Sequence, residues 1–191
     1  MEDSDKLLLN IKTKQTGAFR ILIEALKEIL TEANFIFDET GIKLMAMDSN
    51  KSILIHMKLP SSNFEYYNCP DKVIVGVNML NMFKLIKTMT NSEVLTLFVE
   101  KNNENKLGII MEDNDKKTKT LYHMNLLDIQ NEDIQAGDVE FDTQLTLPSG
   151  DFQKIIRDMI NIGENIEIQS IGSELSLSCV GDFASQKTTL M

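Results

Sequence analysis

Short alternating runs, interrupted at intervals by helical stretches, are the feature that most constrains how this chain can fold. In runs such as residues 42–47 and 53–59, apolar side chains recur at every second position. This period is typical of strands that bury one face of a sheet. We expect roughly ten such strands, so the sequence predicts a fold dominated by sheet.

Three stretches replace the period of two with the spacing of an amphipathic helix. They cover residues 17–31, 79–89 and 149–162, and their apolar residues follow the i, i+3, i+4, i+7 pattern. A helix with one apolar stripe is expected to lie on a sheet. Ser149 stands at the start of the last stretch and is expected to cap its N-terminus.

The second and third helical stretches also match each other in register. Met82 and Phe152 begin the same pattern, in which cations follow the apolar anchor at the second and fifth positions. The first stretch, anchored at Leu22, keeps the cation at the fifth position but carries Glu24 at the second. Strands and a helix therefore recur three times, which predicts an internal repeat of strand–helix–strand units.

The charge of the chain limits its possible partners. Its 29 Asp and Glu residues outnumber its 19 Lys and Arg residues, and the formal net charge is −10. An acidic protein is not expected to coat nucleic acid unless its cations are gathered on one surface. The repeated helix cations would meet that condition if the helices line one concave surface, although ordinary solvated lysines are the competing interpretation. Such a surface would contact phosphates without reading base sequence.

No pattern in the sequence predicts an enzyme. His56 and His123 lack the neighbouring Ser, Cys or carboxylate residues typical of a catalytic triad. Cys69 and Cys179 lie too far apart for a Cys-x-x-Cys motif, and two cysteines do not make a disulfide scaffold. We expect no catalytic residue, no cofactor and no metal site. No apolar run approaches the ~18 residues of a membrane span, so no membrane partner is expected either.

Two further features concern surfaces. Residues 114–138 are polar with spaced apolar positions, which predicts a linker that runs along a surface and is partly pinned to it. Met45, Met47 and Leu54 form an apolar group in the alternating runs. Methionine-rich surfaces adapt to partner side chains, but ordinary core packing explains the same group.

A set of short stretches follows the order and spacing of a known family. They are Glu24–Lys27, Gly41–Ser49, Gly76–Leu80, Leu95–Leu97, Leu147–Phe152, Arg157–Asp158 and Ile162–Gly163. On these stretches the chain resembles the proliferating cell nuclear antigen family of eukaryotic-type sliding clamps. The resemblance runs from about Leu7 to Met191.

The resemblance implies an α+β DNA clamp fold, built from strand–helix–strand repeats with antiparallel sheets outside and helices lining a central channel. Residues 1–118 would form the N-terminal clamp domain and residues 119–138 an interdomain connector. Residues 139–191 would form the first half of a C-terminal clamp domain. The family carries four such units and this sequence shows three, so we expect the chain to be a fragment.

The resemblance also implies a DNA polymerase processivity factor without catalytic activity or cofactor. It would encircle double-stranded DNA, whatever its sequence, as a homotrimeric ring. It would tether DNA polymerase, the clamp loader and other replication and repair proteins that carry Gln-plus-aromatics peptides. Its location would be the nucleus, or the replication site of a DNA virus.

Three sets of site residues follow from the resemblance. The DNA-binding cations of the channel would be Arg20, Lys27, Lys84, Lys87, Lys154 and Arg157. The partner-peptide pocket would use Met47, Ser52, Leu54, Ile134 and Ala136. The subunit interface would pair edge strands at about residues 117–125 and 182–190, including Lys117, Tyr122, Asp182 and Leu190.

Other interpretations remain open at this point. With the same fold, the chain could be one subunit of a heterotrimeric checkpoint-type clamp, or a clamp-like processivity factor that works as a monomer. In a different class, it could be an acidic interaction scaffold that does not bind DNA. The scaffold hypothesis predicts that charge reversal at Lys84 and Lys87 leaves function intact.

Overall fold

The computed structural model describes residues 6–130, 144, 146–172 and 174–190 of the chain. The chain divides into two compact units, Met1–Gln135 and Ala136–Met191. Within the described residues there are twelve strands and three α-helices, so the predicted α+β class and the dominance of sheet are confirmed.

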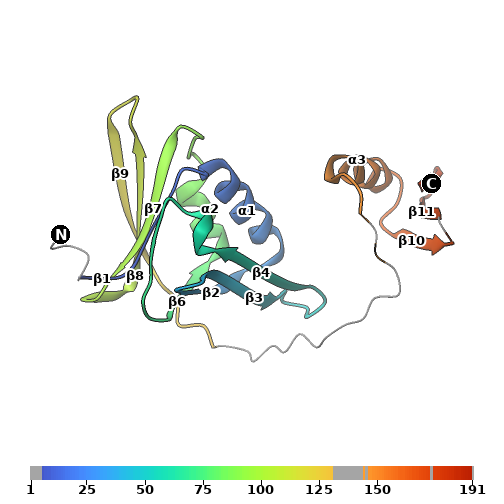
Figure 1. Cartoon of the computed structure of the whole chain (residues 1–191). Coiled ribbons are helices and arrows are strands. Elements are labelled where there is room, and N and C mark those ends of the chain that lie inside the picture. Colours follow the sequence, from blue (N-terminus) through green and yellow to red (C-terminus); the bar gives the residue numbers. More distant parts are fainter. Residues whose placement is uncertain (1–5, 131–143, 145, 173, 191) are drawn as a thin grey trace. The chain divides into compact units, whose positions relative to one another are not determined.

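Two antiparallel sheets form the first unit (Figure 1). The larger sheet has the strand order β5-β1-β7-β8-β9, and the smaller has the order β4-β3-β2-β6. The strands are β1 (Leu7–Thr13), β2 (Glu32–Asp38), β3 (Gly41–Met47), β4 (Leu54–Pro60), β5 (Tyr66–Asn68), β6 (Val73–Asn78), β7 (Glu93–Glu100), β8 (Asn103–Asp113) and β9 (Thr118–Asn125). A short 3-10 helix, η2 (Ser61–Asn63), follows β4.

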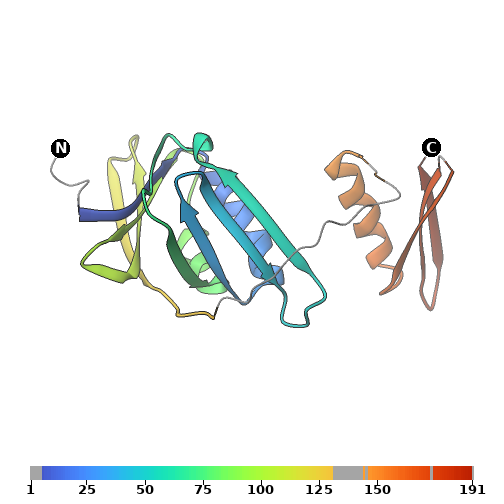
Figure 2. The ribbon, with the colours of Figure 1, turned by 60° about the horizontal axis from the view of Figure 1, so that its bottom comes forward.

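Helices α1 (Thr16–Ile29) and α2 (Met79–Ile86) lie side by side on the same side of both sheets (Figures 1 and 2). Each helix buries one stripe, which includes Ile23 on α1 and Ile86 on α2. The strands bury every second side chain against these stripes, as the period of two predicts. Each fully buried Leu or Ile side chain contributes about 1.5–3 kcal/mol to folding, so this shared core holds the unit together.

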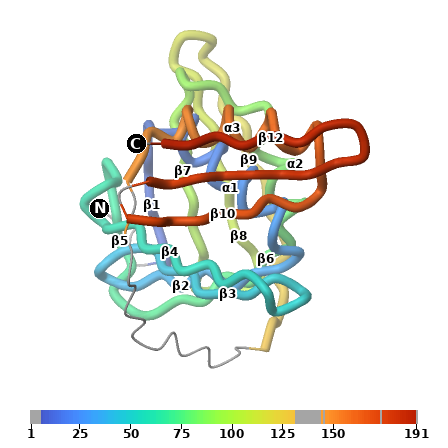
Figure 3. The backbone as a smooth tube through the Cα atoms, turned by 90° about the vertical axis from the view of Figure 1, so that its right-hand side faces the viewer, coloured from blue at the N-terminus to red at the C-terminus, as the bar shows by residue number. Residues whose placement is uncertain are grey.

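The second unit contains α3 (Ser149–Ile160), β10 (Ile166–Ile171), β11 (Glu174–Val180) and β12 (Ser185–Leu190). The three strands run side by side in that order as an antiparallel sheet (Figure 3). A small core of Met159, Leu175, Leu177 and Cys179 joins the helix to the sheet. The order of one helix and three strands is also that of α1, β2, β3 and β4, as the predicted repeat requires.

The predicted helices are confirmed, with ends that differ by up to three residues. The prediction that Ser149 caps the last helix is wrong. Pro148 occupies the capping position with φ −60° and ψ 129°, Ser149 lies inside α3, and no described side chain caps this helix. The proline ring fixes φ near about −65° and proline has no N–H group to leave unpaired, so Pro148 suits the position before the first helical residue. The helix therefore begins at Ser149, one residue earlier than a Ser149 cap would require. Helix α2 does have a side-chain cap, because Asn78 Oδ1 accepts a hydrogen bond from the Asn81 N–H at 3.0 Å.

The connector begins later than the sequence analysis predicts. The predicted connector starts at residue 119, but residues 118–125 form β9, which pairs with β8 from Asp113↔Thr118 to Lys106↔Asn125. This ladder satisfies the backbone groups of β9, so the strand belongs to the larger sheet of the first unit. The chain leaves that sheet only after Asn125, and residues 131–138 of the predicted connector lie outside the described residues.

We expect Ile86→Ala and Leu177→Ala to destabilise different units. Both side chains are 0% exposed, but Ile86 lies in the core of the first unit and Leu177 in that of the second. Such truncations cost about 2–5 kcal/mol through lost burial and the cavity that remains. Calorimetry should show two transitions, and each variant should lower the midpoint of one. Ile21→Ala, at a position that is 60% exposed, is the matched control. A single transition that both core variants lower equally would contradict separate cores.

Candidate functional site

The predicted channel cations lie on all three helices, but they are not equally accessible. Lys84, Lys154 and Arg157 are exposed, and so is Lys87, which follows α2 directly. Helix α2 contains no acidic residue. Among the described residues, no carboxylate lies within 4.0 Å of Lys84 or Lys87. These two lysines therefore present uncompensated positive charge to solvent.

Lys27 and Arg20, on α1, are more restrained. The side chain of Lys27 is only 15% exposed. Its Nζ forms an ion pair with Glu28 and lies 4.7 Å from the centre of the Phe83 ring on α2. Such a cation–π contact stabilises the packing of two helices, and here it ties α1 to α2. Arg20 is half-buried, and its buried Nε has no hydrogen-bond partner among the described residues.

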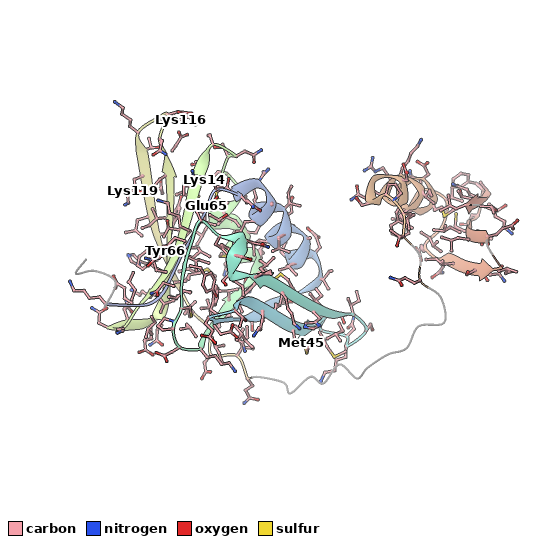
Figure 4. The ribbon with its side chains drawn as sticks, in the orientation of Figure 1. Lys14, Met45, Glu65, Tyr66, Lys116 and Lys119 are labelled. Atoms are coloured by element: carbon pink, nitrogen blue, oxygen red, sulfur yellow. The ribbon has the colours of Figure 1, made fainter. Side chains whose placement is uncertain are left out.

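A hollow of about 290 Å³ lies on the smaller sheet of the first unit. It is lined by β2, by the end of β3 with Met45 and Met47, by the turn that follows, and by Ile129 and Gln130. We refer to it as the β2–β3 hollow. Met45 is labelled on β3 in Figure 4. Alternation along β3 buries Leu44 in the core and leaves both methionines on the opposite face, so the surface interpretation of this methionine pair is the correct one.

The structure brings some of the predicted peptide-pocket residues together. Met47 lies directly opposite Leu54 in the β3–β4 ladder, and the Leu54 side chain is 40% exposed. Ser52 is exposed in the turn beside them but does not line the β2–β3 hollow. Ile134 and Ala136 lie outside the described residues.

Asp48 organises the turn that borders the hollow, and the site prediction missed it. Its Oδ1 accepts hydrogen bonds from the backbone N–H groups of Ser52 and Ile53, both at 2.7 Å. These bonds, that of Ile53 above all, hold the pKa of the Asp48 carboxyl below its usual value. An Asp followed by Ser-Asn is a turn signal, which could have identified this role from the sequence.

Ile129 is a second residue of the hollow that the site prediction missed. It stands among the spaced apolar residues of the linker, which the sequence predicts to be partly pinned to a surface. The spacing alone does not say which surface the linker meets. Only the folded structure places Ile129 beside β2.

The predicted interface residues lie on or next to the last strands of their sheets. Strand β9 ends the larger sheet and β12 ends the sheet of the second unit. Tyr122 packs against the core of the first unit, and Leu190 packs against that of the second. Lys117, with φ 52°, and Asp182 are exposed in the turns that precede these strands.

Ion pairs occupy one end of the larger sheet. Lys116 pairs with Asp113 at 3.1 Å, and Lys119 pairs with Glu112 at 3.0 Å. Both lysines extend from the β8–β9 region in Figure 4. Asp113 also accepts hydrogen bonds from the N–H groups of Asp115 and Lys116, and its pKa is lowered mainly by its bonds to Lys116. These charges are compensated locally, unlike those of Lys84 and Lys87.

Two of the residues considered for catalysis, His123 and Cys69, pack against other side chains or are buried. The ring of His123 meets that of Phe98 edge-on, with the centroids 6.2 Å apart. Cys69 is buried, and burial raises its pKa to about 11. Among the described residues, no group of three or more His, Cys, Asp or Glu side chains is placed to bind a metal. No described helix has the length and apolar character that crossing a membrane requires.

Comparisons with known proteins give consistent results. The family model for the N-terminal domain of proliferating cell nuclear antigen matches residues 8–134, and that for the C-terminal domain matches residues 135–191. The "Probable DNA polymerase sliding clamp 1" of Paramecium bursaria Chlorella virus 1 is 38% identical over 192 residues, which cover 98% of this chain and 73% of the viral protein. The proliferating cell nuclear antigen of Chaetomium thermophilum is 27% identical over 183 residues, which cover 96% of this chain and 70% of the fungal one.

A solved structure shows the same fold. The crystal structure of the proliferating cellular nuclear antigen from Entamoeba histolytica matches with a TM-score of 0.89 and 25% sequence identity. The match covers 96% of this chain and 74% of the Entamoeba chain. The clamp fold expected from the sequence is therefore confirmed.

We expect the stability of the first unit to depend less on pH in an Asp48→Asn variant than in the wild type. Hydrogen bonds lower the pKa of Asp48 in the folded state, whereas an unfolded Asp titrates near ~3.9. The carboxylate therefore stabilises the fold fully above that value, and the stabilisation is lost as the pH falls through the folded pKa. The carboxyl lies close to solvent, so screening keeps the effect small.

Urea denaturation at several pH values from about 6 down to 2 would measure this difference. Glu39→Gln, at an exposed position, is the control for loss of a carboxylate. If Asp48→Asn and the wild type lose stability in parallel over this range, the turn does not depend on the ionised form of Asp48.

Proposed function

The chain belongs to the proliferating cell nuclear antigen family, and we propose that it works as a DNA sliding clamp, the processivity factor of a DNA polymerase. The observation that carries this proposal is the match of both domain models, one after the other, from residue 8 to residue 191. A clamp raises the effective concentration of a tethered enzyme at its template, so it promotes synthesis by linkage. This role requires no catalytic group, and our expectation that the chain is not an enzyme stays a prediction.

The proposed DNA-binding surface consists of the helix cations. Lys84 and Lys87 on and beside α2, and Lys154 and Arg157 on α3, are exposed and suited to phosphate contacts. We assign Arg20 and Lys27 to the same surface, although Lys27 shares its charge with Glu28 and Phe83. Contacts that are many, weak and sequence-independent permit sliding. The net charge of −10 keeps other parts of the surface from holding DNA.

We further propose that three copies form a ring around double-stranded DNA. The support is that β9 and β12 end their sheets among the described residues, with backbone groups available on the outer side. Unpaired sheet edges invite pairing with another chain. Pairing of β9 in one copy with β12 in the next would satisfy both edges, with Lys117, Tyr122, Asp182 and Leu190 at the contact.

The proposed partner site is the apolar surface around Met47 and Leu54, together with the β2–β3 hollow. It would bind peptides with a Gln and paired aromatic residues, carried by polymerase, clamp loader and repair proteins. Ser52, Ile134 and Ala136 belong to this proposal, as does a connector that begins after Asn125 and links the two units. Exposed methionines suit such a site because they adapt to different partner side chains.

The alternatives receive less support. A heterotrimeric checkpoint-type subunit or a monomeric clamp-like factor would share the fold, but the viral and fungal relatives bear the names of sliding clamp and proliferating cell nuclear antigen. An acidic scaffold that avoids DNA does not account for the uncompensated lysines of α2. We propose that the protein acts at sites of DNA replication, in a nucleus or in a virus-infected cell.

We expect the double variant Lys84→Glu and Lys87→Glu to weaken stimulation of a DNA polymerase on a primed template. Each lost phosphate contact should lower the slope of log affinity against log salt by about one. Product length and its salt dependence are the measurements. Lys101→Glu with Lys106→Glu reverses the same number of exposed charges off the helices and serves as the control.

The outcome separates the interpretations. Reduced stimulation in the α2 variant alone supports the proposed surface. If the wild type stimulates the polymerase and the α2 variant stimulates it equally at every salt concentration, α2 does not belong to the DNA-binding surface. Absence of stimulation by the wild type would count against the clamp function of this chain.

We expect Met47→Asp to reduce the affinity for a Gln-plus-aromatics peptide by tenfold or more. A carboxylate at this position would have to be desolvated beneath the apolar side chains of the peptide, which costs about 1.4 kcal/mol or more. Titration of a fluorescent peptide measures the affinity. Ile171→Asp, at a position that is 65% exposed in the second unit, is the control. Equal affinities of Met47→Asp and wild type would exclude Met47 from the peptide site.

A further inference from the structure

The chain crosses the outer face of the smaller sheet just after it leaves β9. We refer to residues 126–129 as the strap. Three hydrogen bonds hold it in the first unit. The N–H of Leu126 donates to the Asn105 carbonyl at 2.9 Å, and the N–H of Leu127 donates to the Gly76 carbonyl at 2.8 Å. At the far end, Asn34 Nδ2 donates to the Ile129 carbonyl at 3.0 Å.

Two of these contacts come from one cross-strand pair. Asn34 on β2 and Gly76 on β6 are direct partners in the ladder between these strands. Both project from the face opposite the core, because their neighbours Ala33, Phe35, Val75 and Val77 are the buried residues. The strap therefore lies over the cross-strand pair Asn34–Gly76. Asn34 donates a hydrogen bond to the strap, and Gly76 leaves room for it because it has no side chain.

The absence of a side chain at residue 76 is required by the strap. A Cβ atom added to Gly76 would lie 2.2 Å from the Leu127 carbonyl oxygen and 2.9 Å from Asn34 Oδ1. The nearest of these atoms is backbone, so it cannot rotate away as the end of a flexible side chain could. Any other residue at this position displaces the strap or moves β6.

The strap reaches the β2–β3 hollow at its last residue. Ile129 lines the hollow beside Asn34, while Leu126 packs against the core of the first unit. The position of one wall of the hollow is thus fixed by the bonds that hold the strap. Loss of either Asn34 or Gly76 releases the same segment.

We propose that Asn34 and Gly76 are positioning residues for partner binding, which hold the strap so that Ile129 forms a wall of the β2–β3 hollow. Neither residue needs to touch the partner for this role to operate through the strap. The inference rests on the proposed function, because the partner is the peptide with a Gln and paired aromatic residues. The affinity for this peptide would then depend partly on the hydrogen bonds that hold the strap against the sheet.

The test uses two variants that release the strap by different means. Gly76→Ala introduces the Cβ that clashes with Leu127, and Asn34→Asp replaces the amide donor with a carboxylate that repels the Ile129 carbonyl. Gly150→Ala, where an added Cβ meets nothing within 4 Å, and Asn102→Asp, at an exposed turn position, are the matched controls.

Two measurements are made on the full chain. Amide hydrogen exchange reports on protection of the Leu127 N–H, and titration of a synthetic fluorescent peptide with a Gln and paired aromatics reports on affinity. We expect both strap variants to lose protection at Leu127 and to bind the peptide about five- to tenfold more weakly, as the loss of one hydrogen bond predicts. The controls should behave as wild type in both measurements.

The double variant distinguishes positioning from general destabilisation. If both substitutions act by releasing one strap, their effects on peptide affinity should not add, and the double variant should bind about as weakly as either single variant. Additive losses of affinity would overturn the inference, because they would indicate two independent effects. Exchange at core amides such as that of Ile109 should stay slow in every variant, and general acceleration there would overturn it too.

Failure of the inference differs from failure of the proposed function. Loss of Leu127 protection with unchanged peptide affinity would overturn the positioning role while the peptide site stands. A wild-type chain that does not bind the peptide would overturn the proposed partner site and, with it, the role of the strap in binding. Retained protection of Leu127 in both strap variants would overturn the holding role of Asn34 and Gly76.

Discussion

The structure depends on the simultaneous burial of helix stripes and strand faces in one core. Helices α1 and α2 each present one apolar stripe, and the two sheets of the first unit present one apolar face each. None of these surfaces is stable in water alone, since an isolated helix or hairpin of this length is marginal. Their common burial fixes which side of every element points outward. The cations of the helices and the methionines of β3 are exposed because the opposite sides are committed to the core.

Backbone hydrogen bonding then decides what the outer surfaces can do. Where a strand has partners on both sides, its donors and acceptors are used within the sheet, as in β7 and β8. Where it ends a sheet, as β9 and β12 do, one row of groups is left for water or for another chain. The strap uses such a position on β6, where Leu127 bonds to Gly76. The contact of the strap with β6 and the open edges of β9 and β12 thus follow from the same requirement that backbone groups be paired.

Sequence periodicity predicted the helices and much of the exposure pattern correctly, because both follow from local geometry. Lys84 lies opposite the buried residues of α2, and its exposure follows from the period of 3.6 alone. The contact of Lys27 with Phe83 could not be predicted in this way, because it joins two helices that are far apart in sequence. The start of the connector was misplaced because polar composition alone does not reveal strand pairing. Residues 118–125 pair with β8, so the edge strand implied by the family resemblance at about residues 117–125 is the correct interpretation of this stretch.

The fold class, the three helical stretches, the repeated cation pattern and the family resemblance could all be predicted from the sequence, because each depends on short stretches of neighbouring residues. The position of Met45 and Met47, facing away from the core beside Ile129, follows from the folded structure and not from the sequence pattern. The folded structure likewise shows that the strap passes over Gly76, at the point where a side chain would block it. These relations join β2, β3, β6 and the strap across long sequence separations. The physical reason is that one face of the smaller sheet packs into the core. Which residues meet on the other face then depends on which strands pair with one another.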